Sequence, residues 1–275
     1  MKTCQALHQL SLQQRPLLYR AALSEMIVPY GDNDNMHAWK HVLDASEYNM
    51  GMLVNSLKLG CDCLGEIFYF DVNQVTWEGK VKCVENAICM HEEDYGILWK
   101  HTDPYTQRSE VRRSRRLVVS SFFTIGNYDY GIFWYLYLDG TIEFEAKLTG
   151  TLYLRAILEG EETSYGSLVA PGVSGMVHEH YFNVRLDMSV DGDSNTVVEM
   201  QADRIPMGPN NPHGNAHGVS QTVIKSEQEG ARDTAPKDSR FWKIENRDCS
   251  NRLGWHPAYK LMPVSYTHLT LPTKA

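Results

Sequence analysis

Apolar and polar residues alternate along two stretches of the second half of the chain. Apolar side chains occupy every second position from Ile142 to Leu148, and again from Phe182 to Val190. A period of two places alternate side chains on the same face of a β-strand. Each stretch therefore predicts an antiparallel strand with one buried face.

Strand signals also dominate the residues before the first of these stretches. β-Branched and aromatic residues run from Leu117 to Leu138, and Asp139-Gly140 then forms a typical tight-hairpin pair. Helical periodicity is weak, near residues 41–58 and 221–234, and the proline- and glycine-rich residues 203–220 predict a long loop. The pattern predicts a mainly β protein, a large antiparallel β-sandwich.

Composition and charge exclude several classes of protein. Of the 275 residues, 43% are hydrophobic and 22% are charged, which is usual for a globular protein. A net charge of −8 argues against a nucleic-acid partner, and the arginine-rich run from Arg112 to Arg116 predicts a solvated or salt-bridged face. No apolar run is long enough to span a membrane. Six cysteines are too few for a disulfide scaffold and suggest mostly reduced thiols.

A histidine pair stands at the head of the second alternating strand. His178 and His180 share the predicted buried face with Phe182. Two convergent imidazoles in a dry pocket suit a borderline metal ion such as Cu(II). The alternative is a pair of core histidines that donate hydrogen bonds to backbone carbonyls.

The segment around Tyr128 resembles the cofactor-forming signature of the copper amine oxidases. Leu117-Val118-Val119 is followed at the family's spacing by Thr124 and then by Asn127-Tyr128-Asp129-Tyr130, and the His178-Glu179-His180 strand resembles the family's copper strand. The resemblance implies the large sandwich of that family's catalytic domain. It further implies that Tyr128 becomes a topaquinone, that Asn127 restrains its ring, and that His178 and His180 bind copper.

Two upstream segments, residues 24–32 and 43–48, resemble those that build the family's substrate pocket. The resemblance places Asp44 at the position of the catalytic proton acceptor and Tyr30 at the tyrosine that hydrogen-bonds the quinone. A carboxylate in a closed apolar site has a raised pKa, which suits proton removal from carbon. Without the resemblance, Asp44 would be a turn residue or helix cap, and both tyrosines would be packing residues. Val42 occupies a gate position where many relatives have an aromatic residue, and Ser46 replaces the family's usual glycine.

Three further expectations concern metals and cysteines. A third copper ligand is required, and no segment matches the family's; His256 lies in a segment that resembles a different part of the family, upstream of that ligand. Asp187 matches part of a peripheral Ca(II) or Mn(II) site. The family often bridges the cysteines that correspond to Cys63 and Cys89.

The chain is expected to divide into a short N-terminal remnant at residues 1–14, a partial catalytic domain at 15–263, and a tail at 264–275. The tail resembles a translated sequencing adapter and is not expected to belong to the fold. On this interpretation the natural reading frame is interrupted after about Pro263, and Met1 is an internal methionine of a longer chain.

The family resemblance implies oxidative deamination of a primary amine by dioxygen, which yields an aldehyde, ammonia and hydrogen peroxide, in a protein that is a homodimer at full length. Two alternatives are an inactive fragment that lacks the third copper ligand and a non-catalytic β-sandwich that binds carbohydrate or protein. The N-terminus lacks the apolar core of a secretory signal, and the compartment stays open, with a cytoplasmic or peroxisomal location favoured over secretion.

Overall fold

The computed structural model describes residues 2–3, 15–33, 35, 37, 41–158, 160–161 and 163–262. The predicted tail at 264–275 and most of the predicted remnant at 1–14 lie outside the described residues. The chain forms two compact units, Leu23–Asn183 and the combination of Met1–Ala22 with Val184–Ala275. Two strands, β2 (Leu18–Pro29) and β12 (Tyr181–Met188), cross the division between them.

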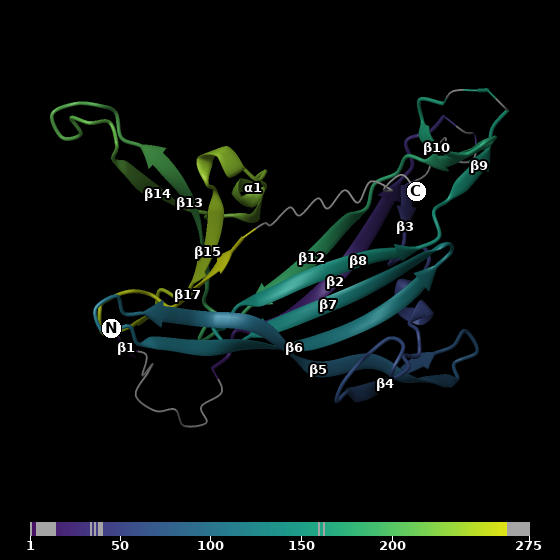
Figure 1. The fold of residues 1–275 in the computed structure, drawn as a ribbon, viewed down its shortest axis with the longest axis horizontal. Coiled ribbons are helices and arrows are strands. Elements are labelled where there is room, and N and C mark those ends of the chain that lie inside the picture. Colours follow the sequence, from purple (N-terminus) through teal and green to yellow (C-terminus); the bar gives the residue numbers. More distant parts are fainter. Residues whose placement is uncertain are drawn as a thin grey trace. The chain divides into compact units, whose positions relative to one another are not determined.

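The unit Leu23–Asn183 holds most of the strands. Its elements are β3 (His41–Leu43), the 3-10 helix η1 (Met50–Leu53), β4 (Phe68–Val75), β5 (Val81–Thr102), β6 (Ser109–Ile125), β7 (Tyr128–Tyr137), β8 (Ile142–Gly150), β9 (Leu154–Ala156), β10 (Gly166–Ala170) and β11 (Val173–Met176). β4 to β8 form a five-stranded antiparallel sheet in chain order, and β10-β11-β9 form a second sheet (Figure 1). β12, β2 and β3 form a third sheet in that order.

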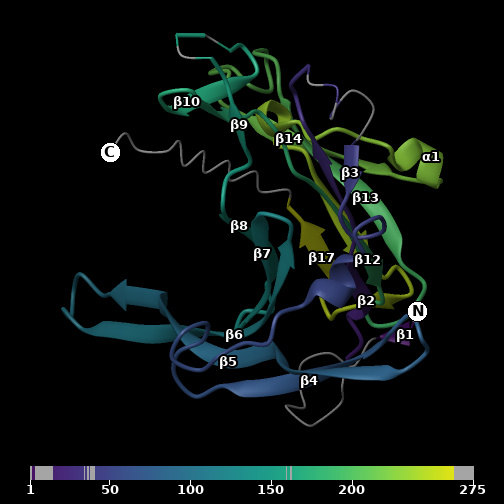
Figure 2. The ribbon, with the colours of Figure 1, turned by 90° about the vertical axis from the view of Figure 1, so that its right-hand side faces the viewer.

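The other unit is built around a four-stranded antiparallel sheet in the order β14-β13-β15-β17 (Figure 1), of which β13, β14 and β17 are also labelled in Figure 2. Its elements are β1 (Lys2–Thr3), β13 (Thr196–Arg204), β14 (His217–Val223), α1 (Glu227–Gly230), the 3-10 helix η2 (Pro236–Asp238), β15 (Phe241–Glu245), β16 (Cys249–Ser250) and β17 (Ala258–Leu261). The prediction of a mainly β, antiparallel fold is confirmed, and both alternating stretches coincide with strands, β8 and β12.

The arginine-rich run lies on β6, opposite acidic residues of β5. Three ion pairs cross between the strands: Arg113 with Asp94, Arg115 with Glu92 at 2.8 Å, and Arg116 with Glu93 at 2.8 Å. The prediction of a salt-bridged face is confirmed. Because most of these side chains are exposed, each pair contributes little stability, but opposite charges at neighbouring positions favour a single strand register.

The weakly predicted helices are wrong. Residues 41–58 form β3, a turn and the short η1, because Asn49 takes a left-handed conformation before η1 and Val54 is extended after it. In residues 221–234 only Glu227–Gly230 is helical, because the preceding residues pair with β13. The predicted loop is also shorter, since β13 runs to Arg204 and β14 starts at His217. Within the described residues, no helix combines the length and apolar character needed to cross a membrane.

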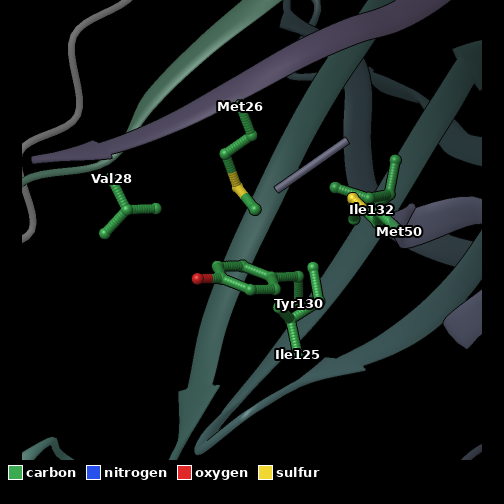
Figure 3. Close-up of a cluster of buried hydrophobic side chains, with 6 residues drawn as sticks. All are labelled: Met26, Val28, Met50, Ile125, Tyr130 and Ile132. Carbon is green, nitrogen blue, oxygen red and sulfur yellow. The ribbon is translucent and has the colours of Figure 1, made fainter. Parts of the chain in front are cut away.

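One hydrophobic cluster supports the residues singled out by the sequence. Its buried members are Met26, Val28, Met50, Ile125, Tyr130 and Ile132. In Figure 3 the ring of Tyr130 lies below Met26, and its hydroxyl points away from Met50 and Ile132. Tyr128 and Tyr30 pack against the cluster as partly buried residues. The cluster therefore places Tyr130 in the apolar interior with its polar end free to bond elsewhere.

Candidate functional site

A tight turn presents Tyr128 at the start of β7. The register of β6 and β7 leaves Gly126 and Asn127 as the turn, and Gly126 has a φ of 59°. Glycine with positive φ at the first turn position suits the twist of a two-residue hairpin. The Thr124 hydroxyl donates to the carboxylate of Asp129 at 2.5 Å, across the base of the turn. These constraints give Tyr128 a defined position at the end of the sheet.

The ring of Tyr128 lies beside both histidines. Its centroid is 5.3 Å from that of His178 and 5.6 Å from that of His180. Its hydroxyl accepts a hydrogen bond from the backbone N–H of Tyr153 at 3.3 Å and shares another with the hydroxyl of Tyr30. The structure thus brings together four residues that the resemblance singled out, and it adds Tyr153, which sequence reasoning missed.

Gly150 is a second residue that sequence reasoning missed. It pairs with Tyr128 across β7 and β8 and has a φ of 99°. A Cβ atom here would lie 2.5 Å from the carbonyl oxygen of Asn127, 2.8 Å from the nitrogen of Asp129 and 2.9 Å from Cα of Tyr128. Only glycine fits this approach without displacing the turn. Asn127 itself is exposed, and its carbonyl accepts a hydrogen bond from the N–H of Thr151 at 2.7 Å.

The two imidazoles have a geometry that suits a metal ion. Their ring centroids are 5.0 Å apart. Nδ1 of His178 donates to the carbonyl of Met176 at 2.9 Å, which leaves Nε2 with its lone pair. Burial, and then the charge of His178, lower the pKa of His180 to about 4, so His180 is neutral at pH 7. Neutral nitrogen donors are what copper requires, and the pair fits as part of a copper site.

A complete metal site is not formed by the described residues. No group of three or more histidine, cysteine, aspartate or glutamate side chains among them could hold a metal ion. His256 is exposed, and its Nδ1 donates to the carbonyl of Cys249 at 2.7 Å. Asp187 lies exposed on β12, and its role in a peripheral Ca(II) or Mn(II) site stays a prediction.

Asp44 is buried directly after β3. The residue is only 3% exposed, and its N–H donates to the carbonyl of Met26 at 2.9 Å. Burial raises the pKa of Asp44 to about 6, although a hydrogen bond from Tyr130 acts in the opposite direction. The Tyr130 hydroxyl also lies 3.4 Å from Nδ1 of His180. Asp44 is therefore joined to the histidine pair through Tyr130, while Val42 lies half-buried against the same core.

Tyr30 is held between two imidazole rings. His37 stacks on it with centroids 4.5 Å apart and planes 9° apart, and His178 lies 5.4 Å away at 27°. Tyr153 contacts Tyr30 edge-on at 5.7 Å. Nδ1 of His37 is hydrogen-bonded to the carboxylate of Asp32 at 2.6 Å, with both side chains almost fully buried. Sequence reasoning missed His37, because a single histidine in a loop has no local pattern.

Cys63 and Cys89, the pair that the resemblance implies to be bridged, lie together in a buried cluster with Leu57. The structure holds both as free thiols joined by a hydrogen bond. The disulfide between them stays a prediction.

Comparison with known proteins places these features in a family. The family model for the copper amine oxidase enzyme domain matches residues 1–275. Histamine oxidase from Arthrobacter globiformis is 50% identical over 251 residues, which are 91% of this chain and 36% of that protein. Primary amine oxidase from Arthrobacter sp. (strain P1) is 46% identical over 264 residues, or 94% of this chain and 40% of that protein.

The fold agrees with these matches. The crystal structure of a copper-containing benzylamine oxidase from Hansenula polymorpha has a TM-score of 0.85 at 35% identity, and the match covers 91% of this chain and 40% of that one. The chain thus spans 36% to 40% of the length of these relatives. Because the enzyme-domain model matches this chain from residue 1 to residue 275, the chain belongs to the copper amine oxidase family.

Proposed function

We propose that this chain carries the catalytic centre for oxidative deamination of primary amines, with dioxygen as electron acceptor and with an aldehyde, ammonia and hydrogen peroxide as products. The observation that carries the proposal is the position of Tyr128, whose ring lies 5.3 Å and 5.6 Å from two imidazoles. Family membership supports amine oxidation in general.

His178 and His180 would hold the copper ion. Copper and dioxygen supply the oxidising chemistry that converts a tyrosine, here Tyr128, to topaquinone, and the quinone supplies a carbonyl that condenses with the substrate amine. The carbonyl of Met176 fixes the orientation of the His178 ring, and burial keeps His180 unprotonated.

Tyr30 and Tyr153 position the oxygen of residue 128. One provides a hydroxyl and the other a backbone N–H at 3.3 Å. Burial raises the pKa of Tyr30 far above its ordinary value, so Tyr30 keeps its proton and acts as a neutral hydrogen-bonding group. Asn127, the turn residue next to Tyr128, restrains the orientation of that ring.

Asp44 is the proton acceptor. With its pKa raised to about 6, it is ionised at pH 7 yet basic enough to take a proton from the carbon next to the amine nitrogen. Tyr130 donates a hydrogen bond to Asp44 and holds the carboxylate in one orientation. Water is excluded from the carboxylate because Asp44 is 3% exposed.

Further features of the full-length protein follow from the family. We propose that it is a homodimer, that Asp187 contributes to a peripheral Ca(II) or Mn(II) site, and that the protein is cytoplasmic or peroxisomal. A relative from Nicotiana tabacum, 44% identical over 254 residues, is named as a peroxisomal diamine oxidase.

A second candidate is favoured by one observation. The described residues supply two imidazoles near Tyr128 and no group of three metal-binding side chains. Two ligands leave copper weakly held, and a weakly held metal would not convert Tyr128. On this alternative the chain by itself is an inactive part of an amine oxidase.

A carbonyl reagent separates the two candidates. The purified chain is incubated with copper and dioxygen and then treated with phenylhydrazine, which forms a coloured adduct with a quinone. Tyr128→Phe removes the precursor, whereas Tyr105→Phe, at a tyrosine that is 95% exposed, is the matched control. Colour in the parent chain and in Tyr105→Phe but not in Tyr128→Phe is the expected result.

The other outcomes are equally informative. Colour that survives Tyr128→Phe would overturn the assignment of the quinone. An uncoloured parent chain would support the inactive fragment, provided that a longer gene product with the same Tyr128 gives the colour.

A further inference from the structure

One imidazole, that of His37, contacts both residues that bind the oxygen of Tyr128. The hydroxyl of Tyr30 and the backbone N–H of Tyr153 are hydrogen-bonded to that oxygen. His37 stacks on the ring of Tyr30 with centroids 4.5 Å apart and meets the ring of Tyr153 edge-on at 5.8 Å. The rings of Tyr30 and Tyr153 also contact each other, at 5.7 Å, so the three rings form a closed triangle. A movement of His37 is therefore transmitted to both partners of the Tyr128 oxygen.

The backbone at Tyr30 is anchored by hydrogen bonds that do not hold its ring. Tyr30 pairs with His178 in an isolated antiparallel bridge. The N–H of the next residue, Gly31, donates to the carbonyl of Val177 at 2.9 Å. These contacts fix the position of Cα of Tyr30, but a tyrosine side chain still turns about two bonds. The direction of its hydroxyl must therefore come from side-chain packing.

Two imidazoles supply that packing, and His37 makes the closer contact. The planes of Tyr30 and His37 are 9° apart, whereas those of Tyr30 and His178 are 27° apart at a centroid distance of 5.4 Å. Parallel stacked rings lose contact when one of them tilts. His37 therefore resists rotation of the Tyr30 ring more than His178 does.

Asp32 fixes the imidazole of His37. Nδ1 of His37 is hydrogen-bonded to the carboxylate of Asp32 at 2.6 Å, and the two side chains are 7% and 0% exposed. A hydrogen bond between two buried polar groups is expensive to break, because water cannot replace it. The bond prevents the imidazole from turning in its own plane, so His37 keeps one orientation against Tyr30.

We propose that His37, oriented by Asp32, is a positioning residue that holds Tyr30 and Tyr153 on the oxygen of residue 128. In the tyrosine form, these two hydrogen bonds keep the ring of Tyr128 from flipping. In the quinone form, the part of the inference that rests on the proposed function, they hold the same ring so that it offers the same edge to each substrate molecule.

The test measures how fast the ring of Tyr128 flips in the full chain, without copper and labelled with 3-fluorotyrosine. The chain has 15 tyrosines, and the fluorine resonance of residue 128 is the one that Tyr128→Phe removes. A fluorine atom on one side of the ring makes its two orientations distinct, so the shape of the resonance reports the flip rate. His37→Ala should speed flipping by about 5- to 10-fold, the change expected when one hydrogen bond is lost. His101→Ala, at an exposed histidine of β5, should leave the rate unchanged.

Further variants and an internal reference separate positioning from stability. Asp32→Ala should speed the same flip, whereas Asp32→Asn, which keeps an oxygen that accepts Nδ1–H of His37, should match the parent. The ring of Tyr135, which is 2% exposed, is the reference, because a general loosening of the fold would speed its flipping as well. Its rate should be the same in every variant.

An unchanged flip rate of residue 128 in His37→Ala would overturn the proposal, and so would equal acceleration of Tyr135, because lost packing alone would then explain the change. Flipping that is unchanged in Asp32→Ala, or faster in Asp32→Asn as well, would contradict the role of the Asp32 hydrogen bond. If His37→Ala does not give the parent's unfolding transition, His37→Gln replaces it. Glutamine can bond Asp32 but presents no ring to Tyr30, so flipping must still be faster.

The measurement reads Tyr128 itself, so a chain that forms no quinone fails the proposed function and still gives this result. In a preparation that contains the quinone, His37→Ala should also shift its visible absorption, because the hydrogen bonds to its oxygen change. An absorption equal to that of the parent would overturn the part of the inference that concerns the quinone.

Discussion

His91 and His180 are each coupled to a carboxylate, the first directly and the second through a phenol. His91 lies 3.1 Å from Glu93, whereas His180 reaches Asp44 only through the hydroxyl of Tyr130. The two carboxylates differ in the direction of their pKa shifts. The pKa of Glu93 is lowered, and the pKa of Asp44 is raised to about 6.

The difference shows that the charge and burial around a carboxylate decide the direction of its pKa shift. Arg116 and His91 stabilise the ionised form of Glu93, which then serves as a fixed acceptor. Asp44 receives a hydrogen bond from a neutral phenol and is buried, so burial dominates and its pKa rises. His180 has no direct contact with a carboxylate among the described residues. Its imidazole is therefore neutral and suited to bind a metal ion.

The largest expected effect comes from substitution of Asp44, the carboxylate with the raised pKa. In a preparation that contains the quinone, Asp44→Asn should slow anaerobic bleaching by a primary amine by about 10²- to 10⁴-fold, because asparagine cannot accept the proton. In the parent protein the rate should fall as the pH drops below about 6, where Asp44 becomes protonated. Asp203→Asn, at an exposed aspartate, is the control. Unchanged bleaching in Asp44→Asn would eliminate Asp44 as the base.

The same substitution should change stability in a pH-dependent way. Because the folded-state pKa of Asp44 is raised, the protonated carboxyl favours folding below the ordinary pKa, and this stability is lost as the pH rises through about 6. At pH 7 the free energy of unfolding of Asp44→Asn should therefore exceed that of the parent by on the order of 2 kcal/mol, with little difference at pH 4. Urea unfolding measures both values. Equal urea midpoints at pH 7 would show that burial of Asp44 costs nothing.

Removal of an imidazole tests the metal side of the comparison. His180→Ala should weaken copper binding to the chain by at least about 100-fold, more than the loss of an outer hydrogen-bond partner costs. His91→Ala should leave copper affinity unchanged, because both ring nitrogens of His91 are already hydrogen-bonded, one to Cys89 and the other to Glu93. Titration calorimetry measures both variants. Equal losses in the two would mean that copper does not distinguish the two histidines.

Gly150→Ala tests the close backbone approach between Gly150 and the turn before Tyr128. A methyl group there would contact the Asn127 carbonyl at 2.5 Å in a left-handed backbone conformation. We expect a loss of about 3 kcal/mol from strain and overpacking together, measured by urea unfolding. Gly51→Ala, where nothing lies within 4 Å of the new atom, should change stability little. Similar losses in both variants would remove the argument for close approach.

The smallest expected effect concerns Glu93. Glu93→Gln keeps a hydrogen-bond acceptor for His91 but removes the negative charge that pairs with Arg116. Because the Glu93 side chain is 37% exposed, the free energy of unfolding at pH 7 should fall by no more than about 1 kcal/mol, measured by urea unfolding. Glu92→Gln, which loses only the exposed ion pair with Arg115, should change stability even less. Equal losses in the two variants would show that the contacts of Glu93 add nothing to an ordinary surface pair.

Local patterns predicted part of the fold. Alternation located β8 and β12 because a period of two needs no information from distant residues. β5 escaped prediction as a strand because its outer half is exposed on both faces and lacks alternation. The contacts among Cys89, His91 and Glu93, at alternate positions of β5, therefore could not be predicted from the sequence.

The candidate site was predictable where it depends on a motif. The run around Tyr128 and the histidine pair identified side chains that the structure brings together. The roles of Gly150 and Tyr153 depend on the register of β7 and β8 and on the chain that follows, which no short motif encodes. Cys63 and Cys89, which the family pattern pairs, lie in one buried cluster, and the disulfide between them stays a prediction.

Tyr130 has one proton to share between two neighbours. When Asp44 is ionised, the phenol points its hydrogen at the carboxylate, and its oxygen is left to receive Nδ1–H of His180, so Nε2 stays bare. Once Asp44 takes up a proton, the phenol can turn toward Nδ1, and the imidazole must then carry its hydrogen on Nε2. Protonation of Asp44 would thus remove the lone pair on Nε2 of His180 that a metal ion would use.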